Sequence, residues 1–138
     1  MNRQMVLRRA LMVSAGFNLL AALLFAFPAS FAGQLAGLPA EVPLVYRAMT
    51  ALFVLLFGAA YAWLAGQDVV DRAFVIFGAI GKISAFVLVV LLWRLGAAGG
   101  IGALLASGDV VFAAVFLWCV GGTRGMASSR DKATRLRS

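Results

Sequence analysis

Four apolar segments, each close to one membrane thickness in length, constrain the fold more than any other feature of the sequence. A helix needs about 20 apolar residues to cross roughly 30 Å of hydrocarbon. Hydrophobic residues make up 64% of this 138-residue chain, against roughly 45–50% in soluble domains. So small a chain cannot bury that much apolar surface in a water-facing fold. The sequence therefore predicts an all-α integral membrane protein whose four transmembrane helices cover Ala10–Phe27, Ala48–Ala65, Ala73–Trp93 and Ile101–Val120.

The basic residues predict how these helices are oriented. Three arginines precede the first segment, Arg72 flanks the short link over 66–72, and the other two links carry only Arg47 and Arg94. Five more follow the fourth segment: Arg124, Arg130, Lys132, Arg135 and Arg137. By the positive-inside rule, both termini and the 66–72 link lie in the cytoplasm. An even number of spans agrees with this placement, so we expect an antiparallel four-helix bundle over residues 1–122.

The net charge of +7 predicts an attraction to anionic lipid headgroups. Each basic residue near the membrane surface contributes about 1 kcal/mol to such binding. A nucleic-acid partner is not expected, because the basic residues lie at helix ends and form no patch with interleaved aromatic side chains. Residues 123–138 are basic, lack apolar periodicity and are expected to form a disordered cytoplasmic tail. We expect the protein in a bacterial cytoplasmic (inner) membrane.

The first apolar segment has two interpretations. Arg8-Arg9, the apolar run and the Ala-Phe-Pro-Ala sequence at 26–29 are together typical of a secretory signal with its cleavage site. The run has about 18 residues, whereas a signal core usually has about 7–15. It also carries a polar stripe, so a retained transmembrane helix is favoured.

The links between the segments are short except for Pro28 to Val45. Three apolar residues in this link fall at helical spacing: Phe31, Leu35 and Leu38. They predict either a short helix lying in the membrane interface or an ordered apolar cap over the mouth of the bundle. In the 66–72 link, Asp68 or Asp71 is placed to cap the start of the third helix.

Two residues of opposite charge lie near the middle of consecutive apolar segments, Lys82 in the third and Asp109 in the fourth. A charge at the bilayer centre costs about 2.5–3.5 kcal/mol on insertion scales, so such residues are rare, usually paired and often functional. A rise of about 1.5 Å per residue puts both of them, together with Asn18 of the first segment, within a few ångströms of the midplane. Arg47, near the outer edge, is a rival partner for Asp109.

Small and polar residues share one face of each predicted helix. These faces carry Ser14, Ala15, Asn18, Ala21 and Ala22 on the first helix, Arg47, Ala51, Gly58, Tyr61 and Ala62 on the second, Gly78, Ala79, Lys82 and Ala85 on the third, and Ala106, Asp109 and Ala113 on the fourth. Small residues mark helix interfaces in membranes, so all four faces are expected to point inward. The candidate ligand- or ion-binding residues are therefore Lys82, Asp109, Asn18, Arg47 and Tyr61.

Several interpretations of this polar group stay open. It is either a structural pin that fixes helix register or the centre of a protein that binds or translocates a small or amphipathic ligand, or protons. Four helices are few to enclose a path, so a homo-oligomer is expected in that case. One alternative is an accessory subunit of a larger membrane complex. A second is a lipid-modifying enzyme with Lys82 and Asp109 as an acid–base pair.

An enzyme is the less favoured class, and no catalytic residue is assigned. The sequence has no histidine, no nucleophile elbow and no phosphate-binding glycine loop. Its single cysteine, Cys119, is expected to pack as a small apolar side chain. With no histidine and one cysteine, the usual nitrogen and sulfur ligands are nearly absent, so no metal or other cofactor is expected. No set of residues links the chain to a known family.

Overall fold

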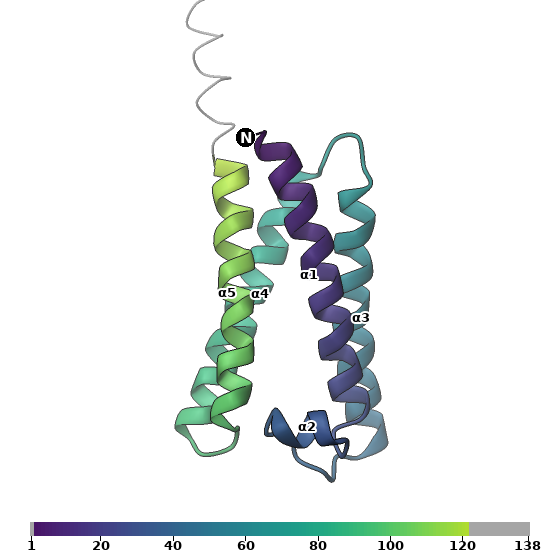
Figure 1. Ribbon diagram of the computed structural model, residues 1–138, viewed down its shortest axis with the longest axis vertical. Helices are drawn as coiled ribbons and strands as arrows, with labels where there is room; N and C mark the ends of the chain where they lie inside the picture. The colour runs from purple at the N-terminus through teal and green to yellow at the C-terminus, as the bar shows by residue number, and fades with distance from the viewer. Residues whose placement is uncertain (1, 122–138) are drawn as a thin grey trace, which may run out of the picture.

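The computed structural model describes residues 2–121, which form five helices and no strand: α1 Arg3–Ala26, α2 Phe31–Leu35, α3 Leu44–Ala65, α4 Arg72–Arg94 and α5 Gly100–Gly121 (Figure 1). All of these except α2 are long and apolar enough to cross a membrane. This confirms the predicted all-helical class and indicates an integral membrane protein. The basic tail predicted over 123–138 lies outside the described residues.

Two of the long helices, α1 and α4, begin before the predicted apolar segments, and a polar residue caps each of them. Asn2 precedes α1, and its side chain accepts a hydrogen bond from the Gln4 amide at 3.1 Å. Asp71 precedes α4, and its carboxylate accepts from the amides of Ala73 at 2.8 Å and Phe74 at 3.2 Å. Such N-caps satisfy amides that have no partner within the helix. Of the two aspartates considered for the cap of this helix, Asp71 is the one that caps it.

The link between α1 and α3 contains the short helix that the apolar spacing predicted. The Ser30 hydroxyl caps α2 by accepting from the Gly33 amide at 3.1 Å. Gly37 has a φ of +78° and ends the helix, with the Leu38 amide donating to the Gly33 carbonyl. This left-handed glycine is the usual C-terminal stop of a helix, so the predicted third position, Leu38, lies just beyond α2. Phe31, at the other end, is 85% exposed.

The long helices form two closely packed pairs. α1 packs along α3, α4 packs along α5, and the pairs meet mainly where α1 contacts α5. Gly58 of α3 permits the close approach within the first pair, because a Cβ there would lie only 3.0 Å from the Asn18 Cβ and 3.2 Å from the Ala15 carbonyl oxygen. Small residues let helix backbones approach in this way in membrane proteins.

The buried core occupies one half of the bundle. This packed half consists of residues 3–18 of α1, 58–65 of α3, 72–82 of α4 and 109–121 of α5. Its largest fully buried side chains include Tyr61, Phe116, Leu11 and Leu64. The open half consists of residues 19–26 of α1, 44–57 of α3, 83–94 of α4 and 100–108 of α5. Within these four stretches Ala22 is the one buried residue.

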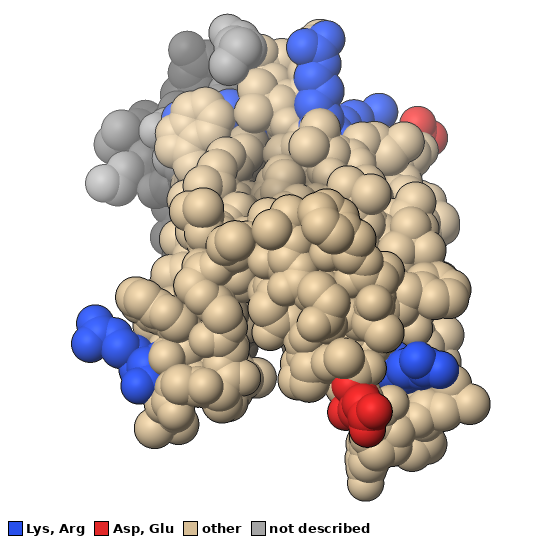
Figure 2. Space-filling view, turned by 60° about the horizontal axis from the view of Figure 1, so that its bottom comes forward, with Lys and Arg blue, Asp and Glu red and all other residues tan. Residues whose placement is uncertain are grey.

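Figure 2, which brings the end with α2 toward the viewer, shows a notch between two lobes at that end of the open half. Figure 1 places α4 and α5 on one side of it and α2 and α3 on the other. The backbone after α2 reaches across: a Cβ on Gly37 would lie 2.8 Å from the Gly99 Cα, and one on Gly102 would lie 2.8 Å from the Ala36 carbonyl oxygen. The two lobes are therefore bridged at the mouth by backbone contacts.

One expectation about the inward faces is wrong. Ala85, assigned to the same packing face as Lys82, is exposed. It lies one turn into the open half, where the helix pairs no longer bury the residues between them. Helical periodicity correctly gave the direction of the face, but it carries no information on how far away the facing helix lies.

Candidate functional site

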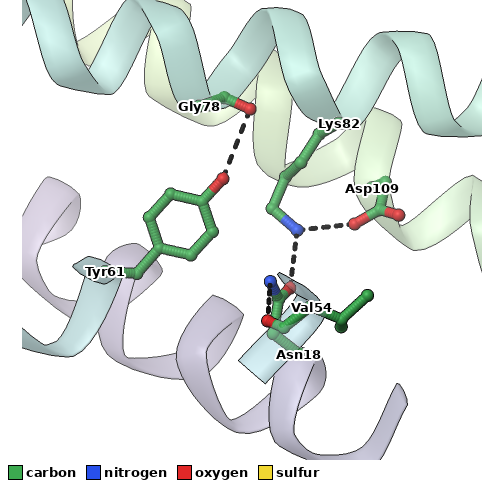
Figure 3. Close-up of polar contacts among 6 residues, drawn as sticks. All are labelled: Asn18, Val54, Tyr61, Gly78, Lys82 and Asp109. Atoms are coloured by element: carbon green, nitrogen blue, oxygen red, sulfur yellow. Dashed lines mark hydrogen bonds and ion pairs between the residues drawn. The ribbon is translucent and has the colours of Figure 1, made fainter. Parts of the chain in front are cut away.

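A charge pair lies at the boundary between the packed half and the open half. Lys82 Nζ of α4 lies 2.5 Å from Asp109 Oδ1 of α5 and 3.2 Å from Asn18 Oδ1 of α1 (Figure 3). Lys82 is 5% exposed and Asp109 18% exposed. We call these three residues the polar centre. Hydrogen bonds to ionised groups are stronger than neutral ones, so the polar centre is a firm link between α1 and the α4–α5 pair.

Three aromatic rings surround the Lys82 ammonium. Nζ lies 5.2 Å from the ring centre of Phe112, 5.4 Å from that of Tyr61 and 5.7 Å from that of Phe17. A cation within about 6 Å of a ring centre is attracted by the ring quadrupole, more strongly where water is excluded. The ammonium has three donors. Two are directed at oxygens and the remaining positive charge faces rings, so Lys82 is fully compensated by the protein.

The orientation of Asn18 is fixed from the opposite side. Its Nδ2 donates to the Val54 carbonyl oxygen of α3 at 3.2 Å, which directs Oδ1 toward Lys82. Both ends of the amide are therefore used. Since Val54 belongs to the α1–α3 pair and Lys82 to the α4–α5 pair, Asn18 connects the two pairs at the depth of the charges.

Tyr61 supports the polar centre without joining its hydrogen bonds. Its hydroxyl donates to the Gly78 carbonyl oxygen at 3.3 Å, and its ring faces Lys82. The ring fits because Gly78 has no side chain: a Cβ there would lie 2.8 Å from the Tyr61 Cε1. Tyr61 also makes an edge contact with Phe116, with ring centres 5.6 Å apart. It therefore couples the polar centre to the core of the packed half.

Arg47, the remaining sequence candidate, does not belong to this group. It lies seven residues before Val54 on α3, which is about 10 Å along a helix axis, near the mouth of the open half. Its side chain is half-buried, and its Nε has no hydrogen-bond partner among residues 2–121. The partner of Asp109 is Lys82. The structure thus brings together Lys82, Asp109, Asn18 and Tyr61, and leaves Arg47 apart.

Sequence reasoning included Tyr61 but missed the other two aromatic residues of the site, Phe17 and Phe112. Phe17 precedes Asn18, and Phe112 follows Asp109 by three residues, on the same side of its helix. A phenylalanine within one turn of an intramembrane polar residue was the available signal. Ser14, one turn before Asn18, is fully buried, and its hydroxyl has no hydrogen-bond partner among the described residues.

Within residues 2–121, no three His, Cys, Asp or Glu side chains lie close enough together to hold a metal ion. Comparison with known proteins finds no match for the chain, whether among family models, curated proteins or solved structures. Fold and site therefore define the class: a small membrane protein of four apolar helices with a charge pair among them.

Proposed function

We propose that this protein binds a small amphipathic ligand at the polar centre and that the ligand reaches it through the open half. The observation that carries the proposal is the position of the charge pair. It lies at the boundary between the packed half and the open half, with buried side chains on one side of it and partly exposed residues on the other.

A purely structural pin accounts for this arrangement less well. A pin fixes helix register best where packing surrounds it, because each charge must be shielded from lipid on every side. Here the faces that continue outward from the polar centre carry Ala21, Ala51, Val54, Phe86 and Ala106, all partly exposed. Polar residues within a membrane that face a partly open space usually mark a ligand or ion path.

The binding function has a direct test with a matched control. Ala106 lies one turn before Asp109 on the same face of α5, whereas Ala114 of α5 is exposed. Protein purified in mild detergent is extracted, and the retained small molecules are identified by mass spectrometry. We expect a retained amphipathic molecule in the wild type and in Ala114→Leu, and its loss in Ala106→Leu, which adds a large side chain one turn from Asp109. Equal retention by both variants would contradict the proposal.

A second candidate is an accessory subunit whose open half receives a helix of a partner protein. The apolar residues lining the open half favour it, because they suit a helix as well as a lipid chain. A copurifying membrane protein that is lost in Ala106→Leu and kept in Ala114→Leu would support this alternative. For the ligand-binding function we also propose a homo-oligomer, which is tested by measuring the mass of the protein in nanodiscs.

The orientation is proposed from the charges alone. The end that carries α1's start and the 66–71 link is rich in arginine and faces the cytoplasm in a bacterial inner membrane under the positive-inside rule. Ala40 and Val69 are exposed at opposite ends of α3. In a Cys119→Ala background, Ala40→Cys should react with an impermeant thiol reagent in intact cells and Val69→Cys only after lysis. The reverse pattern would contradict this orientation.

A further inference from the structure

The two charged residues of the polar centre differ in what they offer to a ligand. Lys82 is 5% exposed and its ammonium is directed at two oxygens and three rings. Asp109 is 18% exposed, and only its Oδ1 is bonded to Lys82. Figure 3 shows its second carboxylate oxygen pointing away from Lys82 with no bond to the residues drawn. An ionised carboxylate only accepts hydrogen bonds. Asp109 therefore keeps one free acceptor for a ligand.

Charge balance further restricts the chemical class of the ligand. Lys82 and Asp109 together are neutral, so a neutral donor leaves the site neutral. A cation would leave one uncompensated charge in a low-dielectric region, which is costly. An anion would meet the free oxygen of Asp109 with like charge and find the ammonium already covered. A hydroxyl group meets the acceptor without either cost.

The apolar part of the ligand has a place beside the polar centre. α3 and α4 follow one another in the chain but pack against different partners, α1 and α5. In their open-half stretches neither helix has a buried residue. The side chains next to the polar centre there, Val54 and Phe86, are apolar. An apolar body can therefore lie between these helices and continue into the hydrocarbon of the membrane.

We infer that the ligand is a neutral lipid-sized alcohol whose hydroxyl donates to the free carboxylate oxygen of Asp109. This inference rests on the proposed binding function and names the chemistry of its ligand. Discrimination then depends on the single donated hydrogen bond. Since that bond goes to a charged acceptor, its loss should weaken binding about 10–100-fold.

The test compares probes of one chain length on the full-length protein in nanodiscs. The probes are 1-hexadecanol, its methyl ether, hexadecylammonium and palmitate, with affinities measured by native mass spectrometry. A second pair, cholestanol and its methyl ether, distinguishes a polycyclic alcohol from a linear one. We expect at least one alcohol to bind about 10–100-fold more tightly than its ether. In the infrared spectrum, the stretching band of the Asp109 carboxylate should shift when that alcohol is added. It should not shift when the ether is added.

The variant Lys82→Met/Asp109→Leu provides the control, because it removes the acceptor without leaving an unpaired charge. It should bind alcohol and ether equally. Tighter binding of the ammonium or of palmitate than of either alcohol would overturn the alcohol inference and leave the binding function standing. If no probe binds and Ala106→Leu retains what the wild type retains, the binding function itself is wrong. Should the double variant not fold, the carboxylate band in the wild type still decides.

Discussion

The packed half and the open half of the bundle are built from the same kinds of residue on the same helix faces. Alanine and glycine line both: Ala79 and Ala113 are fully or almost fully buried in the packed half, whereas Ala51 and Ala106 remain partly exposed in the open half. The two halves differ in the side chains that occupy the space between the helix pairs. Tyr61 and Phe116 occupy the space between the helix pairs on one side, and no buried side chain of that size exists on the other. In a membrane, association depends on such packing, since lipid is as apolar as the side chains.

The polar centre lies at the boundary between the halves, and its two charges differ in how far they are exposed. Lys82 is enclosed by the aromatic residues at the edge of the packed half, and Asp109 keeps the larger exposed fraction. This arrangement separates two tasks. Under the proposed binding function, the lysine is a fixed structural charge and the aspartate is the member that the ligand contacts. Four experiments test the comparison, from the largest expected effect to the smallest.

Lys82→Met should have the largest effect, because it leaves the Asp109 carboxylate without its partner. Removing one member of a buried ion pair typically costs about 3–5 kcal/mol. Equilibrium unfolding in a mixed-detergent titration measures the loss. The double variant Lys82→Met/Asp109→Leu should recover most of it. If the two single losses simply add in the double variant, the residues are not coupled and the boundary between the halves is not held by this pair.

Truncating a phenylalanine in each half compares their packing directly. Phe116 is fully buried and Phe86 is partly exposed. Removing a buried phenylalanine from a core costs about 3–5 kcal/mol in water-soluble proteins. The cost is smaller where the unfolded helices remain in lipid, because the side chain then stays in an apolar medium. We therefore expect Phe116→Ala to cost about 3 kcal/mol or less. Phe86→Ala should cost much less in the same titration. Equal losses would show that the open half is as tightly packed as the other.

Adding one methyl group tests how tightly the packed half is filled. A Cβ on Gly78 would lie 2.8 Å from the Tyr61 ring, whereas one on Gly81, a turn further along α4, has no atom within 4 Å. Overpacking costs about 1–3 kcal/mol, so Gly78→Ala should lower the thermal midpoint of unfolding. Gly81→Ala should leave it unchanged or raise it, because alanine favours helix. A harmless Gly78→Ala would mean that Tyr61 is free to move.

The smallest effect is expected where the chain joins its helices at the end of the packed half. The Arg8 guanidinium donates to the carbonyl oxygens of Gln67 at 2.5 Å and Asp68 at 3.0 Å. Arg9 is exposed. Arg8→Ala should destabilise the protein by about 1 kcal/mol through the loss of these bonds, and Arg9→Ala by less. Both substitutions remove one positive charge. Equal losses of stability would therefore show that the charge at this end of the bundle matters, and not the hydrogen bonds of Arg8.

Much of this fold could be predicted from the sequence because the membrane limits the choices. Apolar length defined the four long helices, and helical spacing placed Asn18, Lys82 and Asp109 on facing surfaces. The difference between the halves was not predictable in this way. Ala79 and Ala85 have the same residue type and each lie three residues from Lys82 on α4, yet Ala79 is buried and Ala85 is exposed. That outcome depends on the distance between the helix pairs. Large side chains on other helices, such as Phe116 of α5, determine this distance.

The bond between Lys82 and Asp109 also has an electrical consequence. Moving one elementary charge across the whole membrane against 100 mV involves about 2.3 kcal/mol. Opposite charges held 2.5 Å apart span at most about a tenth of a roughly 30 Å hydrocarbon layer. The voltage therefore changes the energy of the intact pair by about 0.2 kcal/mol at most. The protein should therefore bind a neutral ligand equally well with and without a membrane voltage. Only an event that separates the lysine from the aspartate would have an energy that depends strongly on the voltage.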